Sequence, residues 1–146
     1  GAGPMEKSLK RQVKKLGLDE RVMFLGCLPH DELFQYYSVA DGLVLASSRE
    51  GWANVLLESM ACGTPVVATA VSGTIDIVKA PAAGQLISDR SALGIATAIR
   101  TLMKNYPDRT ETRKYAEKFS WDETTEQQRL LFKELVNQSS ETVLVS

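Results

Sequence analysis

Short apolar runs alternate with helical patterns along this chain, and this alternation limits its fold more than any other feature. Each run is followed by a stretch with apolar residues at helical spacing. Strands that are apolar throughout are typical of parallel sheets whose two faces are both covered by crossover helices. Four runs have the length and residue types of such strands: R-V-M-F-L-G (21–26), L-V-L-A (43–46), P-V-V-A-T (65–69) and G-Q-L-I (84–87).

The sequence therefore predicts an α/β fold, a Rossmann-like three-layer α/β/α arrangement with a mainly parallel sheet of about four strands. Two later helices should begin after Pro107 and Ser120, because each start has the spacing of a capping box. One domain over 1–136 and a frayed tail over 137–146 are expected. The other predicted helices cover 5–16, about 29–41, 53–61, 71–78 and about 95–106.

Charge and cysteine content exclude several classes of partner. Lys and Arg number 17 against 18 Asp and Glu, without a block of like charge, so no nucleic-acid surface is expected. No apolar run approaches the roughly 20 residues of a membrane span, and no signal-like start is present, so we expect a cytoplasmic protein without direct membrane insertion. Cys27 and Cys62 lack a ligand pattern around them, so we expect buried thiols and neither a metal nor another cofactor.

Ligands of such sheets bind beyond the carboxyl ends of the strands, which here selects the loops 26–30, 47–53 and 70–75. Gly51 in the second loop permits a tight backbone turn immediately before a predicted helix. A helix start favours anions through its dipole and its unpaired N–H groups, so a phosphate could bind there. Its free amides come from Trp52, Ala53 and Asn54.

Two glutamates flank this helix start. Glu50 precedes it, and Glu58 lies eight positions further along, within the helix. Each carboxylate could accept a pair of hydroxyl hydrogen bonds, so the arrangement fits a nucleotide diphosphate sugar, with phosphates between two sets of hydroxyls. Spacing alone leaves an alternative open, in which Glu50 caps the helix and Glu58 is a solvated helix residue.

The stretch E-G-W-A-N-V-L-L-E-S-M-A-C-G-T-P-V-V-A-T (50–69) resembles the signature of the group 1 retaining glycosyltransferases of GT-B fold. That signature is a glutamate, seven residues and a second glutamate, followed by a Gly-Pro turn and a valine-rich strand. The resemblance covers roughly 1–136 and is to part of the C-terminal, donor-nucleotide-binding domain. Further landmarks stand in the family's order: G-A-G-P, R-V-M-F-L-G, Y-S-V-A-D, V-S-G-T-I-D-I-V and F-S-W-D.

The resemblance implies a role for each matching position. Glu58 should bind the ribose hydroxyls, and Glu50 the hydroxyls of the donor sugar, with a catalytic role near the anomeric carbon. The loop formed by Gly26, Cys27 and Leu28 should receive the base through its backbone. The sugar and the distal phosphate should bind the amides of Gly51, Trp52, Ala53 and Asn54.

Two further residues near these loops, Arg49 and Trp52, leave two interpretations open. Arg49 could neutralise a phosphate or form an ion pair with Glu50. Trp52 could cover the sugar or pack on a neighbouring loop. Asp76, where the family usually has a glutamate, is assigned no ligand, and His30 is interpreted as a partly exposed turn residue. The family places Val71, Ser72 and Gly73 along the cleft, although less firmly.

The sequence also departs from the family pattern. The Arg and Lys that clamp the diphosphate in the family, and the acceptor-binding N-terminal domain, have no counterpart here. Either the chain is a truncated piece, or residues 1–4 are extraneous and Met5 is the original start.

We expect this chain to be the donor-binding part of a retaining glycosyltransferase and to be inactive by itself. The complete enzyme could lie at the periphery of a membrane. The alternative is a nucleotide-sugar-binding module that needs a partner chain or self-associates through its sheet edge. A dinucleotide oxidoreductase fits poorly, because no G-x-G-x-x-G pattern follows a predicted strand.

Overall fold

A single parallel sheet organises the molecule. The computed structural model describes residues 2–120, 122, 125–126 and 128–134. Three strands lie in the order β1 (Leu43–Leu45), β2 (Val66–Thr69) and β3 (Gly84–Ile87), and both neighbouring pairs are parallel. The central strand β2 is buried along its whole length. The predicted parallel α/β sheet is confirmed for these three strands.

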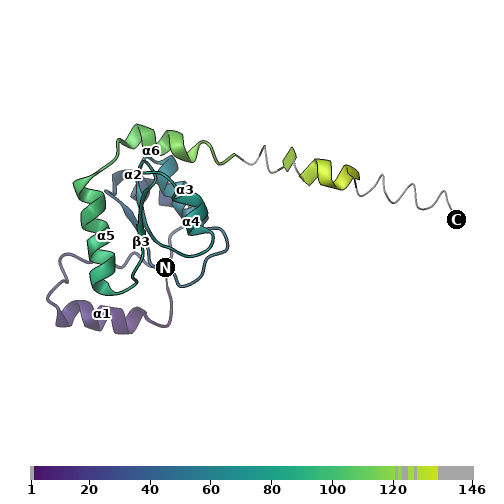
Figure 1. Cartoon of the computed structure of the whole chain (residues 1–146). Coiled ribbons are helices and arrows are strands. Elements are labelled where there is room, and N and C mark those ends of the chain that lie inside the picture. The colour runs from purple at the N-terminus through teal and green to yellow at the C-terminus, as the bar shows by residue number, and fades with distance from the viewer. Residues whose placement is uncertain (1, 121, 123–124, 127, 135–146) are drawn as a thin grey trace.

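Helices cover both faces of this sheet, which confirms the three-layer arrangement. Alternate residues of β2 point to opposite faces, so Val66 and Ala68 belong to one apolar cluster and Val67 to the other. The first cluster includes Leu56 and Met60 of α3, and the second includes residues of α5. Figure 1 shows α5 on one side of the sheet, with α3 and α4 on the other. The helices are α1 (Glu6–Lys15), η1 (His30–Glu32, 3-10), α2 (Leu33–Val39), α3 (Asn54–Ala61), α4 (Thr74–Ile77), α5 (Ala92–Lys104) and α6 (Arg109–Ala116).

The predicted helix start after Pro107 is present, but only half of its capping box forms. The Asp108 carboxylate accepts from the backbone N–H groups of Thr110 at 2.8 Å and Glu111 at 3.2 Å. These hydrogen bonds, the one from Glu111 first, lower the pKa of Asp108 because they favour its charged form. The Glu111 side chain instead pairs with Lys114, at 2.9 Å.

The predicted strand over 21–26 is wrong. This run has no strand pairing, and Met23 is 81% exposed. A strand satisfies its backbone groups through a neighbouring strand, and none of the described strands pairs with residues 22–25. Lys10 of α1 lies over the ring of Phe24, 5.5 Å from its centroid. The run therefore lies next to α1 and outside the sheet, which leaves three strands where the sequence predicted about four.

Beyond Ser120 the chain is described only in part. Residues 122, 125–126 and 128–134 are helical, and the Ser120 hydroxyl accepts from the backbone N–H of Asp122 at 2.9 Å. Glu123, which completes the second predicted capping box, and the tail over 137–146 lie outside the described residues. Within the described ranges, no helix is both long enough and apolar enough to cross a bilayer.

Candidate functional site

The loops that follow β1 and β2 meet backbone to backbone. Gly73 has a φ of 79°, and a Cβ atom at this position would lie 2.1 Å from the carbonyl oxygen of Gly51 and 3.1 Å from that of Glu50. Only glycine combines this conformation with so close an approach. Gly73 therefore holds the loop after β2 against the loop that carries Glu50, as expected for two loops at the same edge of a parallel sheet.

The start of α3 has no side-chain cap. Ala53 is the N-cap residue, and no side chain accepts a hydrogen bond from the first turn. The backbone alone forms the turn, with Asn54 N–H bonded to the carbonyl of Trp52 at 3.1 Å. The alternative in which Glu50 caps this helix is therefore wrong. Ala53 is only 4% exposed and packs in the core with Leu56 and Met60.

Glu58 is held by two side chains from the preceding segment. Its Oε2 accepts from the Tyr37 hydroxyl at 3.3 Å, and its Oε1 lies 3.3 Å from Nε2 of His30. The Glu58 side chain is 31% exposed and that of His30 is 81% exposed. Burial, followed by the charge of Glu58 and the hydrogen bond to it, raises the pKa of Tyr37, so this hydroxyl keeps its proton and donates. Glu58 is therefore more than a solvated helix residue, and His30 is an exposed turn residue with a partner.

A second set of hydrogen bonds fixes the end of α2, which carries Tyr37. The Arg109 guanidinium donates to the carbonyls of Ala40 at 2.9 Å and Ser38 at 2.7 Å. It also donates to Oγ1 of Thr64 at 2.7 Å, and the Thr64 hydroxyl donates to the carbonyl of Tyr37 at 2.5 Å. These contacts join the start of α6 and the turn after α3 to the last turn of α2, where the carbonyls of Tyr36 and Tyr37 also accept from the Ala40 N–H.

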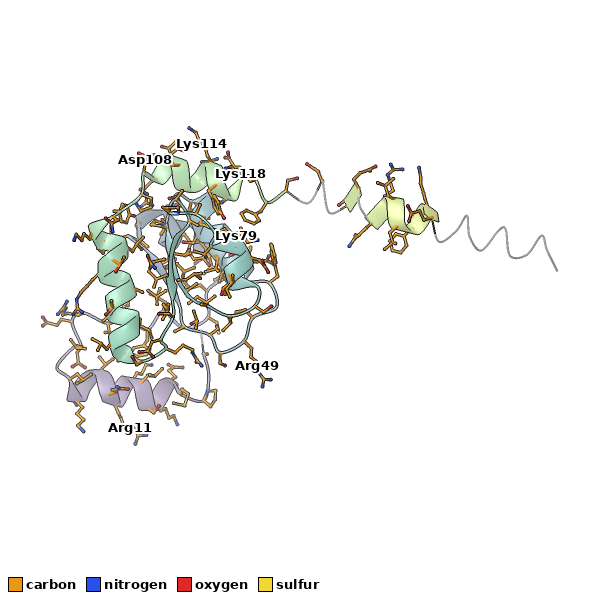
Figure 2. The ribbon with its side chains drawn as sticks, viewed as in Figure 1. Arg11, Arg49, Lys79, Asp108, Lys114 and Lys118 are labelled. Carbon is orange, nitrogen blue, oxygen red and sulfur yellow. The ribbon has the colours of Figure 1, made fainter. Side chains whose placement is uncertain are left out.

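Arg49 and Trp52 lie in different surroundings. Arg49 is exposed and projects away from the molecule in Figure 2, and among the described residues no ion pair joins it to Glu50. The ring of Trp52 lies 6.3 Å from that of Phe119, centroid to centroid, and the residue is 49% exposed. For Trp52 the structure thus shows packing on a neighbouring segment. The guanidinium of Arg49 is exposed at the rim of the loop, where a ligand could reach it.

The remaining predicted positions lie around the same edge. Glu50 is half-buried, and Gly51 and Asn54 are exposed. In the loop before η1, Gly26 has a φ of 69°, Cys27 is exposed and Leu28 is half-buried. Cys27 is exposed and Cys62 is only half-buried, so the expectation of two buried thiols is wrong, most clearly for Cys27, which directly follows the run that lies outside the sheet. Among the described side chains, no three His, Cys, Asp or Glu groups gather into a metal-binding cluster.

Asp76 lies apart from the two glutamates in its interactions. It stands in the first turn of α4 and pairs with Lys79, at 3.1 Å. Both of these side chains are well exposed. This contact gives the carboxylate a surface role, in agreement with assigning no ligand to Asp76.

Sequence reasoning missed the residues that support Glu58. Tyr37 was part of an apolar helical face, and nothing in its spacing relative to Glu58, 21 positions later, indicates contact. Thr64 lies in the Gly-Thr-Pro turn, and Arg109 follows the helix cap at Asp108. No local signal identifies either of them, because their partners belong to other elements.

Comparison with known proteins gives a consistent result. The sequence model of the family described as glycosyl transferases group 1 matches residues 1–119. A D-inositol 3-phosphate glycosyltransferase of Corynebacterium urealyticum is 32% identical over 133 residues, which cover 88% of this chain and 31% of that protein. The chain spans about a third of the length of the first curated relatives that it matches, 33% and 31%.

Solved structures support the same relationship. Sucrose-phosphate synthase from Thermosynechococcus elongatus superposes with a TM-score of 0.76 at 30% identity, covering 94% of this chain and 37% of that one. Anabaena HepE in complex with UDP has a TM-score of 0.67 at 28% identity, covering 90% and 36%. The C-terminal domain of a group 1 glycosyl transferase from Francisella tularensis has a TM-score of 0.68 at 27% identity, covering 79% and 62%.

The paired glutamates, the glycine contact between the loops and the match over residues 1–119 agree with one another. This chain belongs to the group 1 glycosyltransferase family, and it has the parallel α/β sheet found in GT-B glycosyltransferase domains.

Proposed function

We propose that this chain is the donor-binding part of a retaining glycosyltransferase, which transfers a sugar from a nucleotide diphosphate sugar to an acceptor. One observation carries this proposal: the uncapped start of α3 lies between Glu50 and Glu58, at the edge where the loops after β1 and β2 meet. Such a helix start attracts a diphosphate, and each carboxylate can accept hydroxyl groups. The UDP complex of Anabaena HepE supports the choice of a nucleotide ligand.

In this proposal each part of the ligand meets a different part of the site. Glu58 binds the ribose diol, and the exposed Arg49 neutralises phosphate charge. The loop of Gly26, Cys27 and Leu28 receives the base. Backbone amides at the helix start, from Gly51, Trp52 and Ala53, bind the distal phosphate and the sugar, whereas the Asn54 N–H joins them only by exchanging its bond to the Trp52 carbonyl.

Glu50 is the catalytic residue in this proposal. It binds hydroxyls of the donor sugar and stabilises the positive charge that develops near the anomeric carbon. The bond between that carbon and the phosphate oxygen breaks, and the nucleoside diphosphate leaves with the electron pair. The acceptor oxygen forms the new bond on the same face and gives up its proton. We assign no metal or other cofactor to this step.

The other half of the cleft must come from elsewhere. The described chain has no acceptor-binding domain and no second cationic clamp beside Arg49, so we propose that it is inactive in transfer by itself. Its partners are then the nucleotide diphosphate sugar and an N-terminal acceptor-binding domain. We place the complete enzyme in the cytoplasm, with any contact to a membrane surface made by that other part.

A stand-alone binding module is the second candidate, and one observation favours it. Among the described strands, β1 pairs with β2 alone, and Val44 within it is 44% exposed. An open strand edge can pair with a second chain, so a partner subunit or self-association could complete the cleft. The molar mass in solution, measured by light scattering over a range of concentrations, distinguishes this candidate from a monomeric fragment.

Nucleotide titration tests the proposed function. Protein-observed NMR with UDP, GDP and ADP should show saturable binding of one of them. Glu58→Ala should weaken that binding about 10- to 100-fold, because a charged hydrogen-bond acceptor is lost. Glu117→Ala is the matched control, since Glu117 is an exposed glutamate that pairs with Arg113 on α6. Equal affinities of the wild type and Glu58→Ala would contradict the proposal.

A further inference from the structure

The carboxylate of Glu58 is oriented by contacts of unequal strength. The Tyr37 hydroxyl and the His30 imidazole each lie 3.3 Å from a different oxygen of it. The Tyr37 contact is partly buried, whereas the His30 side chain is 81% exposed. An exposed contact contributes little, because water and salt screen it, so His30 can exchange readily for another donor. The orientation of Glu58 therefore depends mainly on Tyr37.

Tyr37 itself has little freedom to move. Its backbone carbonyl accepts from the Thr64 hydroxyl at 2.5 Å, and Thr64 in turn is bonded to Arg109. Arg109 also holds the carbonyl of the next residue, Ser38. The backbone of Tyr37 is therefore tied to two other elements, and its hydroxyl can act as a fixed donor.

A carboxylate oxygen has two acceptor positions. The Tyr37 hydroxyl uses one position on Oε2, which leaves the other position there. The His30 imidazole contacts Oε1, so both positions on Oε1 are available only once the imidazole is displaced. A vicinal diol needs two acceptors side by side, and a rotating carboxylate would offer them only part of the time. A carboxylate whose rotation is already fixed loses less entropy when the ligand binds, so binding costs less free energy.

We propose that Tyr37 is a positioning residue for ribose recognition: it fixes the Glu58 carboxylate so that Oε1 and the free position on Oε2 receive the ribose diol, while the His30 imidazole is displaced. This inference rests on the proposed function, because it takes Glu58 to be the ribose-binding residue. It adds that discrimination for the ribose hydroxyls depends on a residue that does not itself contact the ligand.

The test compares two forms of the same nucleotide on the full 146-residue chain. NMR titration first identifies which of UDP, GDP and ADP binds, and the titration is repeated with its 2′,3′-dideoxy form, which lacks the diol. Tyr37→Phe should weaken binding of the ribonucleotide about three- to tenfold and leave that of the dideoxynucleotide within about twofold. A purely structural role of Tyr37 would weaken both forms equally.

Tyr36→Phe is the matched control. Tyr36 precedes Tyr37 on α2, is 39% exposed, and makes no hydrogen bond to Glu58. Its substitution should leave both affinities within about twofold. A second arm places Tyr37→Phe in a Glu58→Gln background, where it should cause no further loss, because the group that it orients is already altered.

The outcomes separate the two proposals. Failure of the wild-type chain to bind any nucleotide, or binding that is insensitive to Glu58→Ala, would refute the proposed function and this inference with it. Binding that depends on Glu58 but changes equally for the two nucleotide forms in Tyr37→Phe would refute the inference alone. Selective loss of the ribonucleotide, with Tyr36→Phe unchanged, would support it.

Discussion

Strand β2 and the run 22–25 are both short and apolar, yet their surroundings are opposite. Every residue of β2 is buried, with a parallel strand on each side. The run 22–25 has no strand partner, and its four side chains are between 37% and 81% exposed. Apolar composition therefore favours burial. Whether a segment is buried depends on neighbouring segments that complete its backbone hydrogen bonds and pack against its side chains.

The same contrast extends to the elements around each segment. Near β2, the helices α3 and α6 pack against each other and share one core, which includes Met60 and Ala116. Near the run 22–25, helix α1 has no buried residue, and Met5 and Leu16, which flank it, are 63% and 60% exposed. Stability should therefore come almost entirely from the β2 side of the molecule.

The largest expected effect comes from a matched pair of methionines. Met60 is fully buried beside β2, whereas Met23 is 81% exposed in the run 22–25. Met60→Ala should lower the free energy of unfolding by about 2–5 kcal/mol, because it removes buried methylenes and leaves a cavity. Met23→Ala should change it by less than about 0.5 kcal/mol. Urea denaturation of both variants checks this, and a comparable loss in Met23→Ala would show that the run is buried in solution.

A somewhat smaller loss is expected where the two site loops touch. Gly73→Ala would bring a Cβ atom within 2.1 Å of the Gly51 carbonyl oxygen in a left-handed conformation, so the loops must separate. The cost should be at least about 2 kcal/mol in unfolding free energy, together with weaker nucleotide binding. Gly17→Ala is the control, since its φ is 65° but no atom lies within 4 Å of the added methyl group. If both variants lose the same amount, the backbone conformation alone is responsible and the loop contact is not.

The tie between α6 and α2 should have an intermediate effect. Arg109→Ala removes three hydrogen bonds, to Ser38, Ala40 and Thr64. We expect a loss of about 1.5–3 kcal/mol in unfolding free energy, since these are charge-assisted bonds in a partly buried position. Arg113→Ala, on the same helix, loses only a surface pair with Glu117 and should cost less than about 0.5 kcal/mol. Thermal or urea unfolding of the two variants measures the difference, and equal losses would contradict this role of Arg109.

The smallest effect concerns pH. Backbone hydrogen bonds lower the pKa of Asp108 in the folded chain, so this carboxylate keeps its charge to lower pH than it does in the unfolded chain. Its stabilising contribution is therefore complete above the ordinary Asp pKa, about 3.9, and is lost as the pH falls through the lower folded value. Asp108→Asn should flatten the acid side of the stability curve. Unfolding free energies measured from about pH 6 to pH 3 test this, and unchanged curvature would argue against it.

The parallel sheet was predictable because its signals are local. The apolar runs at 43–46, 65–69 and 84–87 form β1, β2 and β3 nearly as predicted, and the helix cap at Asp108 forms where expected. The paired glutamates and the glycine-rich loops were also found from spacing and from family resemblance. Each of these features depends on residues close together in the chain.

Local sequence patterns predict the succession of the three strands and the helices, and they identify the residues in the loops at the carboxyl edge of the sheet. Long-range contacts leave the run 21–26 outside the sheet, bring Gly73 against Gly51, and set Tyr37 and Arg109 in support of Glu58. Periodicity and turn chemistry act within a few residues, whereas pairing and contact join segments far apart in the chain. Their free energy depends on which neighbours are present, and no local pattern contains that information.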